Sequence, residues 1–189
     1  MTKMKRSSKL LSWAVALMRD GQWLKATLLF ERNRAAVRRN WKLSWNLGWC
    51  YFKLENWAIA LEHLAQADRL APNNFACKYG LGSVYLKKRQ FKKAERALVQ
   101  ATRIKESKRA LASLALAYLS QGKIGKAEKA HLRTIRLHPA HSQPYRAYAA
   151  FLYDVGRRRE SAKMTRKARR REIAEANNGS RSDSATRHT

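Results

Sequence analysis

The chain has 189 residues, of which 41 are Lys or Arg and 13 are Asp or Glu, so its formal net charge is +28. A hydrophobic content of 45% with only three prolines excludes a low-complexity chain and favours one domain with a continuous core. Two cysteines exclude a disulfide framework, and so large a positive charge is typical of proteins that meet a polyanion.

The first predicted element is a pair of helices in residues 7–40, joined by a turn at Gly21. Its apolar positions share helix faces and are Trp13, Ala14, Leu17, Ala26 and Phe30. Basic residues before the run Leu10 to Met18 imitate a short signal peptide, but no small-residue cleavage site follows. No stretch is long enough to span a bilayer. We therefore predict a cytoplasmic protein.

Residues 41–74 contain the clearest helix pair. Three residues on its first helix, Leu47, Gly48 and Tyr51, share one face, and the second helix follows a break near Asn56. The second helix has its own apolar face, made by Ala60, Leu64 and Ala67, and Pro72 closes the unit. Small residues at positions 48 and 60 predict a close approach of the two helix axes.

The same pattern returns three more times with a period of roughly 34 residues, in residues 75–107, 108–141 and 142–175. The last copy is weaker, because Arg158, Ser161 and Thr165 replace apolar residues on its second helix.

These five helix pairs resemble the tetratricopeptide repeat. The resemblance implies an all-α, right-handed solenoid of about five helix-turn-helix repeats, with a concave face built from the first helices and a convex face built largely from the second. We predict one repeat domain over residues 1–176. Residues 177–189 are polar with almost no apolar side chain, so we predict a disordered tail there.

No residue pattern in the chain indicates catalysis or a cofactor. The sequence lacks a glycine-rich phosphate loop and a nucleophile elbow, and its acidic residues are scattered singly. Cys50 and Cys77 fall inside predicted helices and are interpreted as buried, reduced side chains. His131, His138 and His141 could hold a metal, but a solvated loop explains the latter two better. We predict no enzyme, no metal site and no small-molecule substrate.

The positive charge is unevenly distributed. Residues 1–40 carry ten basic and two acidic side chains, residues 41–74 three of each, and residues 87–171 twenty-five and five. If the repeat geometry holds, most of the excess lies on turns and on the convex surface. The candidate polyanion-binding residues are Lys88, Arg89, Lys92, Lys93, Arg157, Arg158, Arg159, Lys163, Arg166, Lys167 and Arg170. The alternative is that this charge forms only a solvated face and a polar end for the solenoid.

The register of the resemblance also places particular first-helix side chains in the concave groove. The candidate groove residues are Leu11, Val15, Met18, Lys42, Trp45, Asn46, Trp49, Phe52, Tyr79, Leu86, Leu116, Leu119, Arg146 and Tyr153. Such an apolar, aromatic groove suits an amphipathic helix or an extended apolar peptide. The alternative is that the aromatic residues pack on neighbouring repeats or on the chain's own end.

Some proteins with this repeat hold the carboxylate tail of a chaperone partner with Lys, Asn and Arg from three successive repeats. Of that set only Asn46 is kept here, because Leu11, Val15, Ala76 and Gly80 stand at the other positions. That activity is therefore not expected.

The sequence favours a non-catalytic adaptor that binds a protein segment in an aromatic groove and docks an acidic partner on a basic outer surface. The second hypothesis is an RNA-binding protein whose aromatic residues stack on bases. A third is a subunit or chaperone whose chemistry resides in another chain. Direct insertion into an anionic membrane is less favoured, because Ser161 and Thr165 stand where lipid-facing apolar residues are needed.

Overall fold

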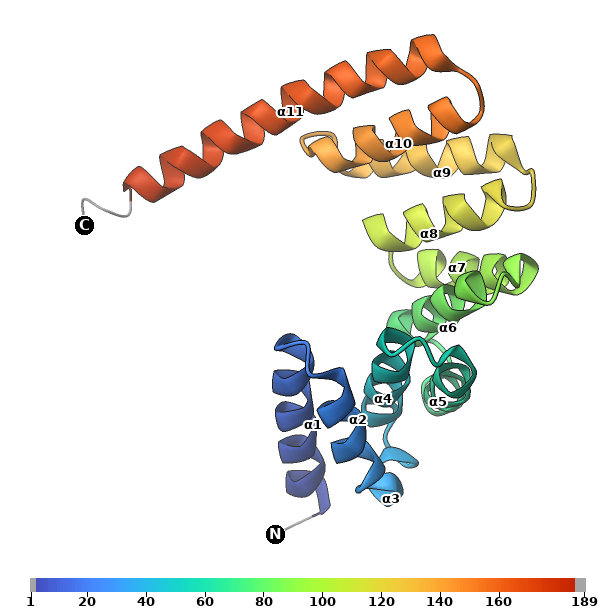
Figure 1. Ribbon diagram of the computed structural model, residues 1–189, viewed down its shortest axis with the longest axis vertical. Coiled ribbons are helices and arrows are strands. Elements are labelled where there is room, and N and C mark those ends of the chain that lie inside the picture. The colour runs from blue at the N-terminus through green and yellow to red at the C-terminus, as the bar shows by residue number, and fades with distance from the viewer. Residues whose placement is uncertain (1–2, 186–189) are drawn as a thin grey trace. The chain divides into compact units, whose positions relative to one another are not determined.

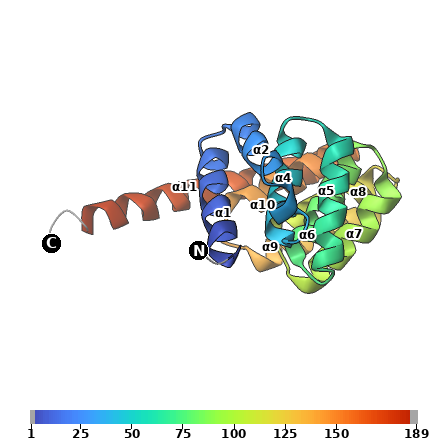
Figure 2. The ribbon, with the colours of Figure 1, turned by 90° about the horizontal axis from the view of Figure 1, so that it is seen from below.

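The structure is a computed structural model that describes the backbone of residues 3–185 and the side chains of residues 8–177 (Figures 1 and 2). Every helix or strand assigned within residues 3–185 is an α-helix, which confirms the predicted all-α repeat fold. The chain forms two compact units, Met1–Glu106 and Ser107–Thr189. This division lies at the predicted boundary between the third and fourth repeats. A single repeat domain over residues 1–176 stays a prediction.

The first unit contains three helix pairs. Its helices are α1 Lys3–Arg19, α2 Trp23–Glu31, the short α3 Arg34–Val37, α4 Trp41–Lys53, α5 Trp57–Leu70, α6 Phe75–Lys87 and α7 Phe91–Ile104. Helices α4 and α5 pack together, as do α6 and α7, while α4 also contacts α1 and α6. The first helices of successive repeats therefore lie beside one another.

Helices α4 and α6 begin at asparagines that occupy equivalent positions in successive repeats. The side chain of Asn40 accepts hydrogen bonds from the backbone N–H groups of Lys42 and Leu43. Asn74 does the same for Ala76 and Cys77. These oxygens satisfy amides that have no partner within the first helical turn, so the sequence fixes where each first helix starts.

The turn inside each repeat has one residue with a positive φ. The position recurs once in every repeat, and its occupants are Gly21 (φ 71°), Glu55 (60°), Arg89 (56°), Gly122 (71°) and Gly156 (81°). Left-handed backbone suits glycine, whereas a side chain there is strained. The first unit carries that strain at two of its three turns.

Small residues allow the two helices of a repeat to approach closely. A Cβ atom added at Gly48 would lie 2.8 Å from Leu64 Cγ, and one added at Gly82 would lie 2.5 Å from Leu98 Cγ. Both leucines are fully buried. The predicted close approach at Gly48 is confirmed.

One predicted packing residue of the first repeat is exposed instead. Trp13 was expected on the packing face, but its exposed fraction is 63%. Helix α1 contributes Leu10 and Ala14 to the core, and Leu17 packs against the same cluster. Since neighbouring residues on a helix are about 100° apart, Trp13 points away from the face that Ala14 buries.

The second unit contains two helix pairs, α8 Lys108–Leu119 with α9 Ile124–Leu137 and α10 Ser142–Asp154 with α11 Arg158–Ala185. Its core includes Ala127, Tyr148, Phe151 and Leu152. His131 occupies the position in its repeat that Leu64 and Leu98 occupy in theirs. The His131 ring lies 6.0 Å from Tyr148 and 5.1 Å from Phe151, and burial lowers the pKa of His131 to about 4.

Helix α11 packs on α10 although its sequence matches the repeat weakly. Ser161 stands at the position of Ala60, is buried, and donates a hydrogen bond to the Ala149 carbonyl oxygen at 2.8 Å. Ala168 is also buried. The helix continues to Ala185, past the end of α10 in Figures 1 and 2, and so into the segment predicted as a disordered tail. Disorder of residues 177–189 stays a prediction, and its last four residues lie outside the described residues.

Candidate functional site

Aromatic side chains form a stacked row along helix α4. Trp45, Trp49 and Phe52 are spaced four and three residues apart, so they share one face of the helix. The ring centroids of Trp45 and Trp49 lie 5.5 Å apart with an interplanar angle of 8°. Those of Trp49 and Phe52 lie 4.8 Å apart at 17°. Trp49 therefore lies between two nearly parallel rings.

The row continues onto the first helix of the next repeat. Tyr79 on α6 lies 6.5 Å from the Trp49 ring, and Phe75, one turn earlier on α6, stacks on Tyr79 at 5.8 Å. We call Trp45, Trp49, Phe52, Phe75 and Tyr79 the aromatic face. Its five side chains are half-buried. Phe75 was missing from the predicted groove residues, although its position four residues before Tyr79 is a signal that could have identified it.

The members of the aromatic face differ in how firmly the fold holds them. The indole N–H of Trp45 donates to the Ala76 carbonyl oxygen at 2.8 Å, and Trp45 and Phe52 pack against the cluster that contains Ala60 and Leu64. These two residues are thus partly structural, as the alternative interpretation of the sequence expected. The ring contacts of Trp49 are with other members of the face.

The helices around the aromatic face carry only positive formal charge. The sequences of α1, α4 and α6 contain no Asp or Glu. Lys42, Lys53 and Lys87 are exposed, and the Lys53 ammonium lies 5.5 Å from the Trp23 ring centroid. Lys78 is paired with Asp68 of α5 at 2.8 Å. A ligand with carboxylates would therefore meet attraction and no repulsion from these three helices.

Other candidate groove residues of the first unit lie on α1, α4 and α6. Leu11 and Met18 are half-buried against the core of the first repeat, while Val15 is 39% exposed. Asn46 donates from its side chain to the Lys42 carbonyl oxygen at 2.7 Å, and Leu86 is half-buried. Since α1 and α6 both contact α4, these residues flank the aromatic face within one unit.

The remaining candidate groove residues belong to the second unit. Leu116 on α8 and Tyr153 on α10 are 52% and 61% exposed, and the Arg158 guanidinium lies 5.8 Å from the Tyr153 ring centroid. Leu119 is half-buried against the core of this unit, and Arg146 pairs with Glu172 at 3.3 Å. A single groove that joins these residues to the aromatic face stays a prediction.

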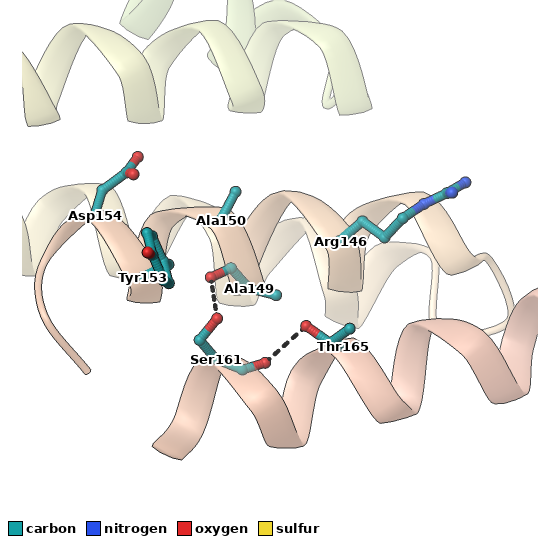
Figure 3. A pocket seen from close by; sticks show the side chains of 7 residues that line it. All are labelled: Arg146, Ala149, Ala150, Tyr153, Asp154, Ser161 and Thr165. Atoms are coloured by element: carbon teal, nitrogen blue, oxygen red, sulfur yellow. Dashed lines mark hydrogen bonds between the residues drawn. The ribbon is translucent and has the colours of Figure 1, made fainter. Parts of the chain in front are cut away.

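An open hollow of about 350 Å³ lies between α10 and α11 (Figure 3). Its lining residues are Arg146, Ala149, Ala150, Tyr153, Asp154, Ser161 and Thr165. Arg146 and Thr165 stand where the second repeat has Trp45 and Leu64, the two side chains that approach Gly80 of the third repeat. In the second repeat these two positions hold apolar side chains that pack on the next repeat. In the fifth repeat the same positions hold polar side chains. The hydroxyls of Ser161 and Thr165 are satisfied by backbone carbonyls.

Neither the thiols nor the histidines form a reactive site. Cys50 and Cys77 are buried, and burial raises the pKa of Cys50 to about 12 and that of Cys77 to about 11. Both therefore stay protonated near neutral pH. His138 and His141 have ring centroids 5.9 Å apart, but among the described residues no three His, Cys, Asp or Glu side chains gather as a metal site does. No helix in the described part of the chain is long and apolar enough to cross a membrane.

The candidate polyanion-binding residues divide into two groups. The first follows the turn after α6: Lys88 caps that helix, Arg89 has φ 56°, and Lys92 and Lys93 are exposed on α7. The Lys93 ammonium lies 5.8 Å from the Tyr85 ring centroid. The group is therefore solvent-facing except for the half-buried Lys88.

The second group lies on and before α11, and its members are not equivalent. Arg157 makes ion pairs with Glu128 and Glu160, both at 2.6 Å, so its charge is compensated within the chain. The other members are exposed on α11 and are Arg158, Arg159, Lys163, Arg166, Lys167 and Arg170. Sequence alone could not separate Arg157 from its neighbours, because Glu128 is 29 residues away.

Comparison with known proteins supports the fold and the repeat. A family model described as tetratricopeptide repeat matches residues 11–75 and 79–142. The solved structure of MamA from Desulfovibrio magneticus RS-1, from its residue 41 onward, has a TM-score of 0.78 and 19% identity, covering 89% of this chain and 96% of that one. A crystal structure of MamA has a TM-score of 0.75 and 24% identity, covering 87% and 96%. At these identities the likeness shows the fold alone.

Among curated proteins, the chain is similar to the BBSome complex member BBS4 of Mus musculus. The two are 28% identical over 117 residues, which is 61% of this chain. The match spans 22% of the mouse protein, about a fifth of its length. Because the repeat model matches well over half of the residues, the chain belongs to the tetratricopeptide repeat family, whose members are generally non-catalytic scaffolds for protein–protein interaction.

Proposed function

We propose that the protein is a non-catalytic adaptor that binds a segment of a partner protein on the aromatic face of α4 and α6. The observation that carries this proposal is the row of half-buried rings on neighbouring first helices. Five aromatic side chains retain partial exposure there, and aromatic residues at such sites often dominate protein-binding energy. The bound segment is an amphipathic helix or an extended apolar peptide.

The charge around the face selects the flanks of that segment. Lys42, Lys53 and Lys87 are exposed on helices that contain no acidic residue. A segment with carboxylates beside its apolar residues would gain long-range attraction, which raises the association rate more than the final affinity. The basic outer surface, including α11, docks a second, acidic partner. We place this adaptor in the cytoplasm, where buried and protonated Cys50 and Cys77 stay reduced.

The geometry of the rings favours protein over RNA at this face. Base stacking needs an aromatic ring with an open face. Trp45 and Phe52 stack on Trp49 with centroids 5.5 and 4.8 Å away, so these neighbouring rings occupy part of the surface on which a base would stack. The half-buried rings keep some exposed surface for a ligand, and apolar side chains contact aromatic rings readily. The RNA hypothesis therefore depends on the basic surface.

A photo-crosslinking experiment tests the proposal. Benzoylphenylalanine is placed at position 49, cells are irradiated, and the crosslinked segment is identified by mass spectrometry. Benzoylphenylalanine at position 13 is the control, since Trp13 is 63% exposed but lies outside the face. We expect position 49 to crosslink one reproducible protein segment that position 13 does not.

Binding of the identified segment is then measured by calorimetry. We expect Trp49→Ala to weaken affinity roughly 30-fold, the loss typical of an aromatic hot spot, and Trp13→Ala to change it less than about twofold. Affinity should depend weakly on salt and persist after nuclease treatment. If both variants bind equally well, the aromatic face is not the site.

A further inference from the structure

The acidic and the basic side chains of α11 lie on different sides of the helix. Its described acidic residues are all engaged within the second unit: Glu160 with Arg157 at 2.6 Å, Glu172 with Arg146 at 3.3 Å, and Glu175 with Ser142. Glu175 accepts both the backbone N–H and the hydroxyl of Ser142, at 3.0 and 2.8 Å. These contacts fix the carboxylates on the side of α11 that faces the rest of its unit.

The basic side chains of α11 lie away from that side. The helix packs through Ser161, the half-buried Met164 and the buried Ala168. Six exposed cations, which we call the basic ridge, follow the helix beyond that packing line: Lys163, Arg166, Lys167, Arg169, Arg170 and Arg171. Within the described residues none of these six side chains makes a hydrogen bond or an ion pair. Lys163 still lies close enough to Glu160 to help lower the pKa of that carboxyl, whereas the five other cations of the ridge have no such neighbour among the described residues.

The composition of the ridge distinguishes between possible anions. Four of its six cations are arginines, which bind phosphate oxygens in a bidentate manner. The one large apolar side chain exposed on the described part of α11 is Ile173, at 54%. Insertion into a membrane surface needs a wide apolar face, and a protein interface needs an apolar core. Single-stranded nucleic acid needs aromatic rings for stacking, and the described part of α11 contains none.

From these observations we propose that the basic ridge binds the phosphate backbone of duplex nucleic acid. Lys163 and Arg171 are eight residues apart, so the ridge is about 12 Å long. A duplex carries one charge per about 1.7 Å, or about seven phosphates over that length. Since that number counts both strands, one strand presents about three or four phosphates over that length, and a similar number of the six cations can face a duplex at once. The proposal specifies the basic half of the adaptor function and does not depend on the aromatic face.

The test measures binding of the full-length protein to a fluorescein-labelled 24-base-pair DNA duplex of mixed sequence. Fluorescence anisotropy is recorded between 50 and 300 mM salt for the wild type and for Arg166→Gln, Lys167→Gln, Arg170→Gln combined. The matched control combines Arg109→Gln, Lys129→Gln and Arg136→Gln, three exposed cations of the same unit outside α11. Both variants lose three positive charges, so a difference between their affinities shows that the position of the charges matters.

We expect the ridge variant to flatten the slope of log affinity against log salt by about 2.7, or about 0.9 for each lost phosphate contact. Its affinity at 0.1 M salt should fall roughly 100-fold, while the control variant changes a few-fold. Trp49→Ala should leave duplex binding unchanged, which separates this proposal from the aromatic face. The proposal is wrong if the ridge and control variants weaken binding equally.

Three further measurements identify the anion. We expect weaker binding to a 24-nucleotide single strand, to vesicles that mix phosphatidylcholine with phosphatidylserine, and to polyglutamate, each supplied at equal anionic charge. The assignment to duplex nucleic acid is wrong if the ridge binds any of these three ligands more tightly than the duplex. The ridge would then be a binding site for that class of ligand.

Discussion

Helices α4 and α10 are equivalent first helices, three repeats apart, but they present different chemistry. Helix α4 carries a row of stacked rings where α10 carries an arginine, an alanine and a largely exposed tyrosine; the paired positions are Trp45 and Arg146, Trp49 and Ala150, and Phe52 and Tyr153. The positions that pack within a repeat stay small in both, as Gly48 and Ala149 show. The repeat therefore constrains the inner positions and leaves the outer ones free to differ.

That difference is the basis for the separate binding roles that we propose for the two units. The first unit holds its aromatic side chains by mutual stacking and by the bond from Trp45 to Ala76. The second unit has Arg146, Ala150 and Tyr153 at the equivalent positions, and its last helix exposes a row of cations. The proposed adaptor would therefore carry one apolar and one electrostatic surface on a single repeated fold.

The largest expected effect tests how much of the aromatic face is structural. Trp45→Ala should lower the free energy of unfolding by about 3 kcal/mol, because it removes a packed ring and its hydrogen bond to the Ala76 carbonyl oxygen. Trp49→Ala should cost about 1 kcal/mol and Tyr153→Ala less than about 0.5 kcal/mol. Urea denaturation followed by circular dichroism measures all three. Equal losses for Trp45→Ala and Trp49→Ala would make the whole row core.

The second prediction concerns how the stability of the second unit depends on pH. Burial lowers the pKa of His131 to about 4, below its ordinary value of 6.5. The unfolded chain therefore binds a proton more readily than the folded one in this range. The stability that this group contributes is complete above about pH 6.5 and is lost as pH falls toward 4, by at most about 3 kcal/mol.

His131→Leu checks this expectation, since leucine stands at the equivalent positions 64 and 98 of the first unit. We expect the variant to lose less stability than the wild type between pH 6.5 and 4 in thermal melts. An unchanged slope in His131→Leu would show that other groups govern the acid response.

The third effect concerns the close approach inside a repeat. Gly82→Ala should destabilise the protein by about 1–3 kcal/mol, because the new Cβ would lie 2.5 Å from Leu98 Cγ. The second unit already has Ala115 at the equivalent position, so Ala115→Gly should cost only about 1 kcal/mol through lost helix propensity and packing. Chemical denaturation of both variants compares them. A neutral Gly82→Ala would mean that Leu98 moves freely.

The smallest effect concerns the turns, where the first unit keeps two side chains at positive φ. Glu55→Gly and Arg89→Gly should each stabilise by about 0.5–1 kcal/mol, because glycine removes left-handed strain. Gly122→Ala should destabilise by about 1 kcal/mol, and its cause is conformational alone, since no atom lies within 4 Å of the new Cβ. Differential scanning calorimetry resolves these shifts. Destabilisation by Glu55→Gly would show that this side chain makes a favourable contact.

Sequence periodicity by itself determined the repeat and its core. The predicted apolar positions Ala60, Leu64 and Ala67 are fully buried, and the predicted turn residue Gly21 has a positive φ. These features could be predicted because a helix places residues three and four apart on one face whatever its neighbours are. The packing helix of each repeat also lies only a short turn away, so the relevant contacts are local.

Only the tertiary structure decided what the side chains on outer positions do. Trp45 bonds to a carbonyl 31 residues away, and Arg157 pairs with a carboxylate 29 residues away. Trp13 has the spacing of a core residue yet is exposed. Ser161 has a polar side chain yet is buried, and its hydroxyl donates a hydrogen bond to the Ala149 carbonyl oxygen. Arg157, whose charge is paired with Glu128 and Glu160, likewise cannot be told by sequence from the exposed basic residues that follow it on α11. Contacts between repeats determine the roles of Trp45 and Arg157, and helical spacing within one repeat contains no information about the repeat beside it.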